Sequence, residues 1–102
     1  MVLNYENVSK AMFAFGRLLP REREVVEFLW NCDVFKGGVS DLTRSMGRPD
    51  TDIPNILKVV RTLQSMGVVY VFDVHDAKAY GSKKHMFLLD GWIDKVVEAS
   101  NR

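Results

Sequence analysis

The clearest pattern in the chain is a two-faced segment over residues 51–66. At the helical period of about 100° per residue, its apolar and polar positions separate onto opposite sides. The apolar side consists of Ile53, Ile56, Leu57, Val59, Val60, Leu63 and Met66. The polar side consists of Thr51, Pro54, Asn55, Lys58, Arg61, Thr62 and Ser65. This pattern predicts a helix that buries one face and exposes the other.

Local signals place the ends of this central helix. Asp50 or Thr51 is suited to cap its first turn, and Pro54 is tolerated there because first-turn amides have no acceptor within the helix. Gly67 supplies the left-handed residue that ends many helices. After it, β-branched and aromatic residues fill positions 68–74, and a short apolar run covers 86–89. These runs predict two strands joined by a long, lysine-containing loop.

The remaining elements follow from the same reasoning. The spacing of apolar residues predicts a helix over 4–17, and Pro20 starts a second helix that ends near residues 31–33. A turn over 35–38 follows, and Val39 is interpreted as a short strand. Ser40 is the expected N-cap of a helix over 41–46 that Gly47 closes, and a final helix begins after Gly91.

The whole chain is predicted to be one α+β domain, mainly α with a small antiparallel hairpin. It has 102 residues, of which 47% are hydrophobic and 26% charged, as expected for one globular domain. We expect an N-terminal helix in 1–18, a core in 19–90 and a C-terminal helix in 91–102. With neither a membrane span nor a signal peptide in the pattern, the expected location is the cytoplasm. The single cysteine, Cys32, is interpreted as a buried thiol.

Few residues are suited to catalysis or metal binding. His75 and His85 lie in or beside the predicted loop, and the sequence has no cysteine pair, HExxH spacing or glycine-rich phosphate loop. The acidic residues near helix starts complement helix dipoles. We therefore expect no enzymatic activity, no metal and no cofactor; a small enzyme or ligand carrier is the least favoured hypothesis.

Several apolar residues near the two ends of the chain provide more apolar surface than one small core needs. They suggest a homodimer interface, although packing on the same domain explains them equally well. The interface candidates are Tyr5, Val8, Met12, Phe13, Phe15, Trp92 and Val96.

Four segments of the chain carry a family resemblance. LPREREVVEFLWN, VSDLTRSMG, LQSMGVVYV and FLLDGW, which lie within residues 19–92, resemble the DNA-binding core of MarR-type winged helix-turn-helix transcriptional regulators. The resemblance implies a dimer on double-stranded DNA, with the central helix in the major groove and the hairpin loop as a wing beside it. No residue indicates a small-molecule effector.

The resemblance also implies which residues contact DNA. Thr51, Pro54, Asn55 and Lys58 would face the groove, and Arg61 and Thr62 would lie nearer the backbone. Asn55 suits adenine and Lys58 suits guanine. The phosphate contacts would come from Ser40, Thr43, Arg44, Arg48, Lys78, Lys83 and Lys84.

The charge distribution supports this function only in part. The net charge is +1, and residues 36–90 hold eight basic and six acidic side chains. Asp50 and Asp52 bring negative charge to the groove end of the helix, and Asp76, Ala77 and Lys78 replace the Asp-x-Arg element of many wings, which lowers the expected affinity. The alternative hypothesis is therefore a winged helix that binds protein instead of DNA.

Overall fold

The computed structural model describes residues 5–75 and 82–100, which form helices and a small sheet. The α-helices are α1 (Tyr5–Gly16), α2 (Pro20–Trp30), α3 (Val39–Ser45), α4 (Ile53–Ser65) and α5 (Trp92–Ser100). A 3₁₀ turn, η1 (Asp50–Asp52), precedes α4, and the strands are β1 (Phe35–Lys36), β2 (Val69–His75) and β3 (Ser82–Leu88). The predicted α+β class with a small antiparallel sheet is confirmed.

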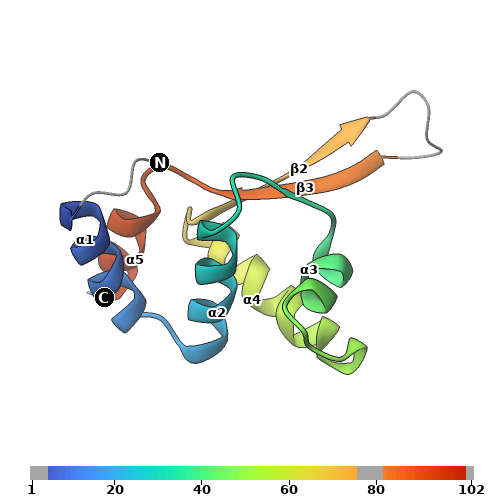
Figure 1. Cartoon of the computed structure of the whole chain (residues 1–102), viewed down its shortest axis with the longest axis horizontal. Coiled ribbons are helices and arrows are strands. Elements are labelled where there is room, and N and C mark those ends of the chain that lie inside the picture. Colours follow the sequence, from blue (N-terminus) through green and yellow to red (C-terminus); the bar gives the residue numbers. More distant parts are fainter. Residues whose placement is uncertain (1–4, 76–81, 101–102) are drawn as a thin grey trace.

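The sheet has the order β1-β3-β2 and is antiparallel throughout. Its central pairing sets Val71 opposite Met86 and Tyr70 opposite Phe87. Helices α2, α3 and α4 lie on one side of the strands, and α1 and α5 pack side by side at the end of the molecule (Figure 1). The side of the hairpin facing away from α4 carries no helix in this view.

The core lies between the helices and the sheet. Its largest fully buried side chains include Leu29 from α2, Leu42 from α3, Ile56 and Leu63 from α4, and Met86 from β3. Ile56 and Leu63 belong to the apolar side of the central helix predicted from periodicity. Burial of such side chains contributes roughly 1.5–3 kcal/mol each, so the contact of α4 with α2, α3 and the sheet fixes the orientation of its exposed face.

The terminal helices belong to the same core. Trp92 is fully buried, and its ring lies 5.6 Å from that of Phe15 and 6.1 Å from that of Trp30, measured between centroids. Phe15 is 6% and Val96 1% exposed. These three predicted dimer residues, Phe15, Trp92 and Val96, are therefore covered within the single chain and leave almost no surface for a partner.

Several predicted boundaries need correction. Val39 starts α3 and is not a strand; the short strand is β1, whose pairing with β3 is non-local. Ser40 is not the N-cap, because α3 follows Gly38, whose N–H donates to the Asp41 carboxylate at 3.3 Å. Neither Asp50 nor Thr51 caps α4, which follows η1 without a side-chain cap.

The two glycine stops are confirmed. Gly47 has φ of 77° and Gly67 has φ of 79°, the left-handed conformation that glycine adopts without strain. Gly47 allows the tight link from α3 to η1, and Gly67 turns the chain from α4 into β2. Together they hold α3, α4 and the hairpin close to one another.

No helix within residues 5–75 and 82–100 combines the length and the apolar character that crossing a bilayer requires. Cys32 is half-buried, whereas the sequence predicted a buried thiol.

Candidate nucleic-acid interface

The exposed face of α4 divides into two flanks. Thr51, Pro54, Lys58, Arg61 and Thr62 are all exposed, as the periodicity predicts, and Asn55 is half-buried. Residues 58 and 61 are three positions apart, so their side chains lie about 60° apart around the helix, toward the two edges of its exposed face. Each flank of α4 borders its own surface hollow, and the two hollows have different neighbours.

The first hollow, here called the hairpin-side hollow, lies between α3, α4 and the sheet and has a volume of about 410 Å³. Its floor is apolar and includes Leu57, Val60 and Val71. Its polar rim comes from three elements, with Ser40 at the start of α3, Arg61 and Gln64 on α4, and Lys84 on β3. The structure thus brings three of the sequence-predicted contacts, Ser40, Arg61 and Lys84, to one place.

The second hollow, here called the α2-side hollow, has a volume of about 660 Å³ and lies between the start of α2 and α4. Lys58 and Thr62 line it from α4, opposite Leu19, Pro20, Arg21 and Glu22. The Thr62 hydroxyl donates its hydrogen bond to the Lys58 carbonyl within the helix, at 3.0 Å. Lys58 and Arg61 therefore share the exposed face of α4, as the sequence predicts, but border different hollows.

Arg44 and Arg48 are engaged by carboxylates. Arg44 Nε and Nη2 donate to the two Asp50 oxygens at 3.0 and 3.1 Å. Arg48 Nη1 donates to Asp52 at 3.0 Å, and its other nitrogens contact Glu24 of α2. Arg48 thus joins α2 to η1. Hydrogen bonding to Glu24 and Asp52 raises its pKa, and hydrogen bonding and charge from Asp50 raise the pKa of Arg44.

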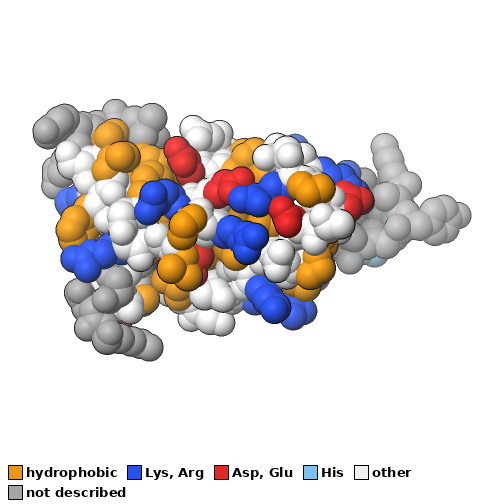
Figure 2. All heavy atoms as spheres, turned by 90° about the horizontal axis from the view of Figure 1, so that it is seen from below, with side chains coloured by type: hydrophobic (Ala, Val, Ile, Leu, Met, Phe, Trp, Pro, Cys, Tyr) orange, Lys and Arg blue, Asp and Glu red, His pale blue; other side chains and the backbone are white. Residues whose placement is uncertain are grey.

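These ion pairs change the charge that the surface presents. Because Asp50 accepts two hydrogen bonds from Arg44 and lies beside its positive charge, the pKa of its carboxyl is lowered. Figure 2, which views the molecule from below, shows basic and acidic side chains interleaved across the middle of this face. The face is a set of paired charges instead of a continuous basic surface, so a phosphate would have to displace a carboxylate to reach either arginine.

The structure excludes one predicted contact and leaves another outside the described residues. Thr43 is fully buried, and its hydroxyl donates to the Val39 carbonyl at 2.8 Å. It cannot reach a phosphate, so that prediction is wrong. Lys78 lies outside the described residues.

The two remaining predicted lysines lie on β3. Lys84 Nζ is 3.3 Å from the Asp73 carboxylate, and the exposed Lys83 is paired in register with Val74.

Two residues of this region were missed by sequence reasoning. Gln64, which the helical period puts between the apolar and polar sides of the central helix, stands on the rim of the hairpin-side hollow. Lys36 was read as part of a turn, but it lies in β1 opposite His85. The helical period could have placed Gln64 beside Arg61. The position of Lys36 depends on a strand pairing across about fifty residues of sequence, for which the sequence carries no local signal.

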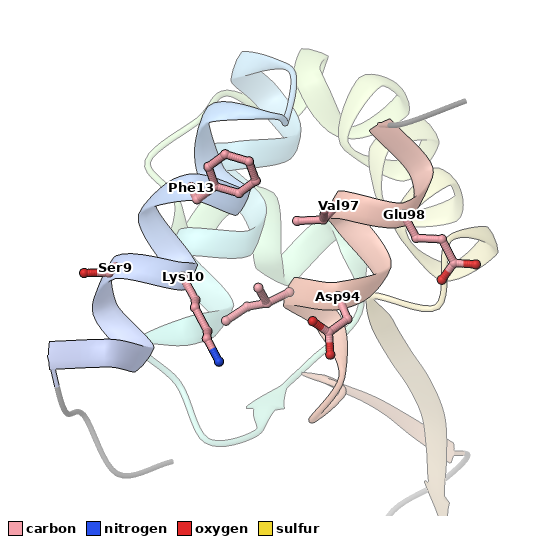
Figure 3. Close-up of a pocket in the computed structure, with 7 residues that line it drawn as sticks. Ser9, Lys10, Phe13, Asp94, Val97 and Glu98 are labelled. Carbon is pink, nitrogen blue, oxygen red and sulfur yellow. The ribbon is translucent and has the colours of Figure 1, made fainter.

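A second surface lies between α1 and α5. A groove of about 620 Å³ is lined by Ser9, Lys10, Phe13, Ile93, Asp94, Val97 and Glu98. Figure 3 shows Phe13 and Val97 facing each other from the two helices, with Lys10 and Asp94 below them. Beside the groove, α1 exposes Met12 by 62%, Phe13 by 53% and Val8 by 40%. These three predicted interface residues are available to a partner; the Tyr5 side chain lies outside the described residues.

Within the described part of the chain, no group of three or more His, Cys, Asp or Glu side chains is arranged to hold a metal ion. Comparison of the sequence with protein-family models and with curated proteins finds no match.

Proposed function

We propose that this chain is a winged helix-turn-helix protein that binds double-stranded DNA as a homodimer and acts as a transcriptional regulator. The order α2-β1-α3-α4-β2-β3, with a tight glycine turn before η1 and α4, supports a winged helix. In this arrangement α3 supports α4, α4 enters the major groove, and the hairpin is the wing.

The observation that carries the proposal is the rim of the hairpin-side hollow. Ser40, Arg61 and Lys84 come from three separate elements and meet at the junction of α4 with the hairpin. A hydroxyl and two cations grouped in this way suit the phosphate backbone beside a helix inserted in the groove. Arg61 carries most of the expected contribution, because Lys84 shares its charge with Asp73.

Base recognition is assigned to the exposed first turns of α4. Thr51, in η1 just before α4, and Pro54 are exposed, and Asn55 is half-buried and carries an amide of the kind that pairs with adenine. Lys58 lies toward the α2-side hollow, so we expect it to contribute less to binding than Arg61. The surface is only weakly basic because Arg44 and Arg48 are paired, which predicts modest affinity that rests on few phosphate contacts and falls as the salt concentration rises.

The homodimer is assigned to α1 and the α1–α5 groove. Val8, Met12 and Phe13 expose apolar surface beside the groove, which suits a second copy of the same helix pair. A two-fold dimer that separates the two α4 helices by about 34 Å would place them in successive major grooves.

The same observations favour one alternative, a winged helix that binds another protein. The paired arginines and the exposed apolar side chains of α1 both suit that function. The two proposals differ in what α4 does, because only DNA binding requires the exposed cations of α4 and the hairpin.

Titration of a labelled pool of random-sequence duplexes with the full chain tests the proposal. We expect binding at low salt that weakens steeply between about 50 and 200 mM salt, because phosphate contacts release counterions. Selection from the pool should yield a preferred sequence, and Asn55→Ala should weaken binding to that sequence by about 1–3 kcal/mol but leave binding to unselected duplexes unchanged. If micromolar protein retains no duplex at low salt, the DNA proposal is wrong.

A further inference from the structure

The face of the hairpin that points away from α4 carries an aromatic cluster. Along β2 the side chains alternate, so that Val69 is buried and Val71 half-buried while Tyr70 is 51% exposed. Met86 is buried on the same side as Val69 and Val71. The residues between them, Tyr70 and Phe72 on β2 and His85 and Phe87 on β3, therefore belong to the outer face.

The rings on this face touch one another. Ring centroids lie 5.5 Å apart for Tyr70 and Phe87, 5.7 Å for Phe72 and Phe87, and 5.8 Å for Tyr70 and Phe72. The His85 ring lies 5.6 Å from Phe72. The contacts hold the three rings in a fixed arrangement, here called the aromatic platform, and cross-strand packing of this kind also supports the hairpin.

The platform is bordered by cations. The register aligns Phe72, His85 and Lys36 across the three strands, and it aligns Val74 with Lys83 in the next row. Lys36 and Lys83 are exposed, and the described strand positions of the outer face include no acidic residue. Asp73 points to the other face, where it pairs with Lys84, and Asp33 precedes β1. Cross-strand packing alone explains the rings but not this one-sided charge.

We propose that the aromatic platform binds single-stranded nucleic acid, independently of the duplex interface on α4. Bases are flat aromatic groups that stack on exposed rings, and the phosphates between them require nearby cations. Lys36 and Lys83 supply those cations on two edges of the platform. A second copy of this face is a poorer occupant, because two facing platforms bring lysines together without a carboxylate to pair them.

The test uses the full chain and a fluorescent thymidine oligonucleotide of about 15 nucleotides, a length within the usual site size and without stable self-pairing. Fluorescence anisotropy at low salt should show binding. Tyr70→Leu, which keeps an apolar side chain but removes the ring, should weaken binding about tenfold, since one stacked base contributes that order of affinity. Circular dichroism verifies that the variant is folded.

Two charge variants separate this site from the duplex interface. Lys36→Ala should flatten the dependence of log affinity on log salt by about 0.7 for the oligonucleotide and leave duplex binding unchanged. Arg61→Ala should leave oligonucleotide binding unchanged. The inference is overturned if no oligonucleotide binds, if folded Tyr70→Leu binds as tightly as the original chain, or if Tyr70→Leu disrupts only self-association or binding to a protein.

Discussion

Arg44 and Asp50 form a two-point contact in which both carboxylate oxygens accept from one guanidinium, at 3.0 and 3.1 Å. Both side chains are more than half exposed, so the pair lies at the surface, between the end of α3 and the turn that leads into α4. The contact occupies a cation that the sequence alone assigned to DNA. Asp50 therefore determines how much positive charge the surface between α3 and α4 presents.

The first prediction is that Asp50→Asn strengthens duplex binding. The substitution removes a negative charge and frees the Arg44 guanidinium for a phosphate, so affinity at low salt should rise about three- to tenfold. Binding titrations of the two proteins against the same duplex measure the change. Asp94→Asn, which makes the same change in net charge on α5, should produce a much smaller increase. Unchanged or weaker binding by Asp50→Asn would show that Arg44 does not face DNA.

The second prediction concerns acid unfolding. Arg44 lowers the pKa of Asp50 in the folded chain below the value of about 3.9 in the unfolded chain. The contact therefore stabilises the fold above about pH 4, and this stabilisation is lost as the pH falls through the lowered pKa.

Thermal unfolding across pH measures this effect. The original chain should have a higher Tm than Asp50→Asn near neutral pH, and the difference should disappear as the pH falls below the unfolded pKa of about 3.9 and through the lowered pKa of Asp50 in the folded chain. In an Arg44→Ala background, Asp50→Asn should produce no such pH-dependent difference. A constant difference at all pH values would mean that the pair is not the cause.

The third prediction tests the packing of the terminal helices. Trp92 is fully buried between Phe15 and Trp30, and its Nε1 has no hydrogen-bond partner among the described residues. Trp92→Ala should lower the free energy of unfolding by about 3–5 kcal/mol, because it leaves a cavity. Trp92→Phe should cost clearly less, since it keeps a ring and removes the unpaired N–H. Chemical denaturation followed by circular dichroism measures the free energy of unfolding of both variants. If Trp92→Phe lowered it as much as Trp92→Ala, Nε1 would have a hydrogen-bond partner in the folded chain.

The fourth prediction concerns the dimer. Phe13 is about half exposed on α1 and lines the groove with α5, so Phe13→Glu would place a charge in an apolar interface. Light scattering should give a dimer mass for the original chain and a monomer mass for Phe13→Glu. Val74→Glu, at an exposed apolar position on the hairpin, should remain a dimer. A monomer mass for the original chain at high concentration would refute the dimer proposal.

Local patterns predicted most elements of the fold. The apolar sides of α2 and α4, the two left-handed glycines and the two long strands follow from spacing and residue type. The errors arise where a residue depends on a distant partner. Lys36 belongs to a strand only because β3 lies beside it, and Arg48, which the resemblance assigned to DNA, joins α2 to η1 through Glu24 and Asp52.

The candidate site was predicted less completely than the fold. Periodicity identified the exposed residues of α4, but it could not show that Lys58 and Arg61 border different hollows. The resemblance assigned Thr43 to DNA, whereas the structure buries it; because α3 begins at Val39, the threonine hydroxyl donates to the Val39 carbonyl. The sequence suited Phe15, Trp92 and Val96 equally to a partner and to their own domain, because the contact of α1 with α5 that buries them is long-range.

The salt dependence of duplex binding by Arg61→Ala tests the central claim most directly. Arg61 stands where α3, α4 and the hairpin meet, whereas the exposed Arg21 borders the hollow on the other flank of α4 and provides a matched control. The plot of log affinity against log salt should become less steep by about one unit in Arg61→Ala and remain unchanged in Arg21→Ala. Equal slopes for Arg61→Ala and the original chain would contradict the placement of DNA at the junction of α4 and the hairpin.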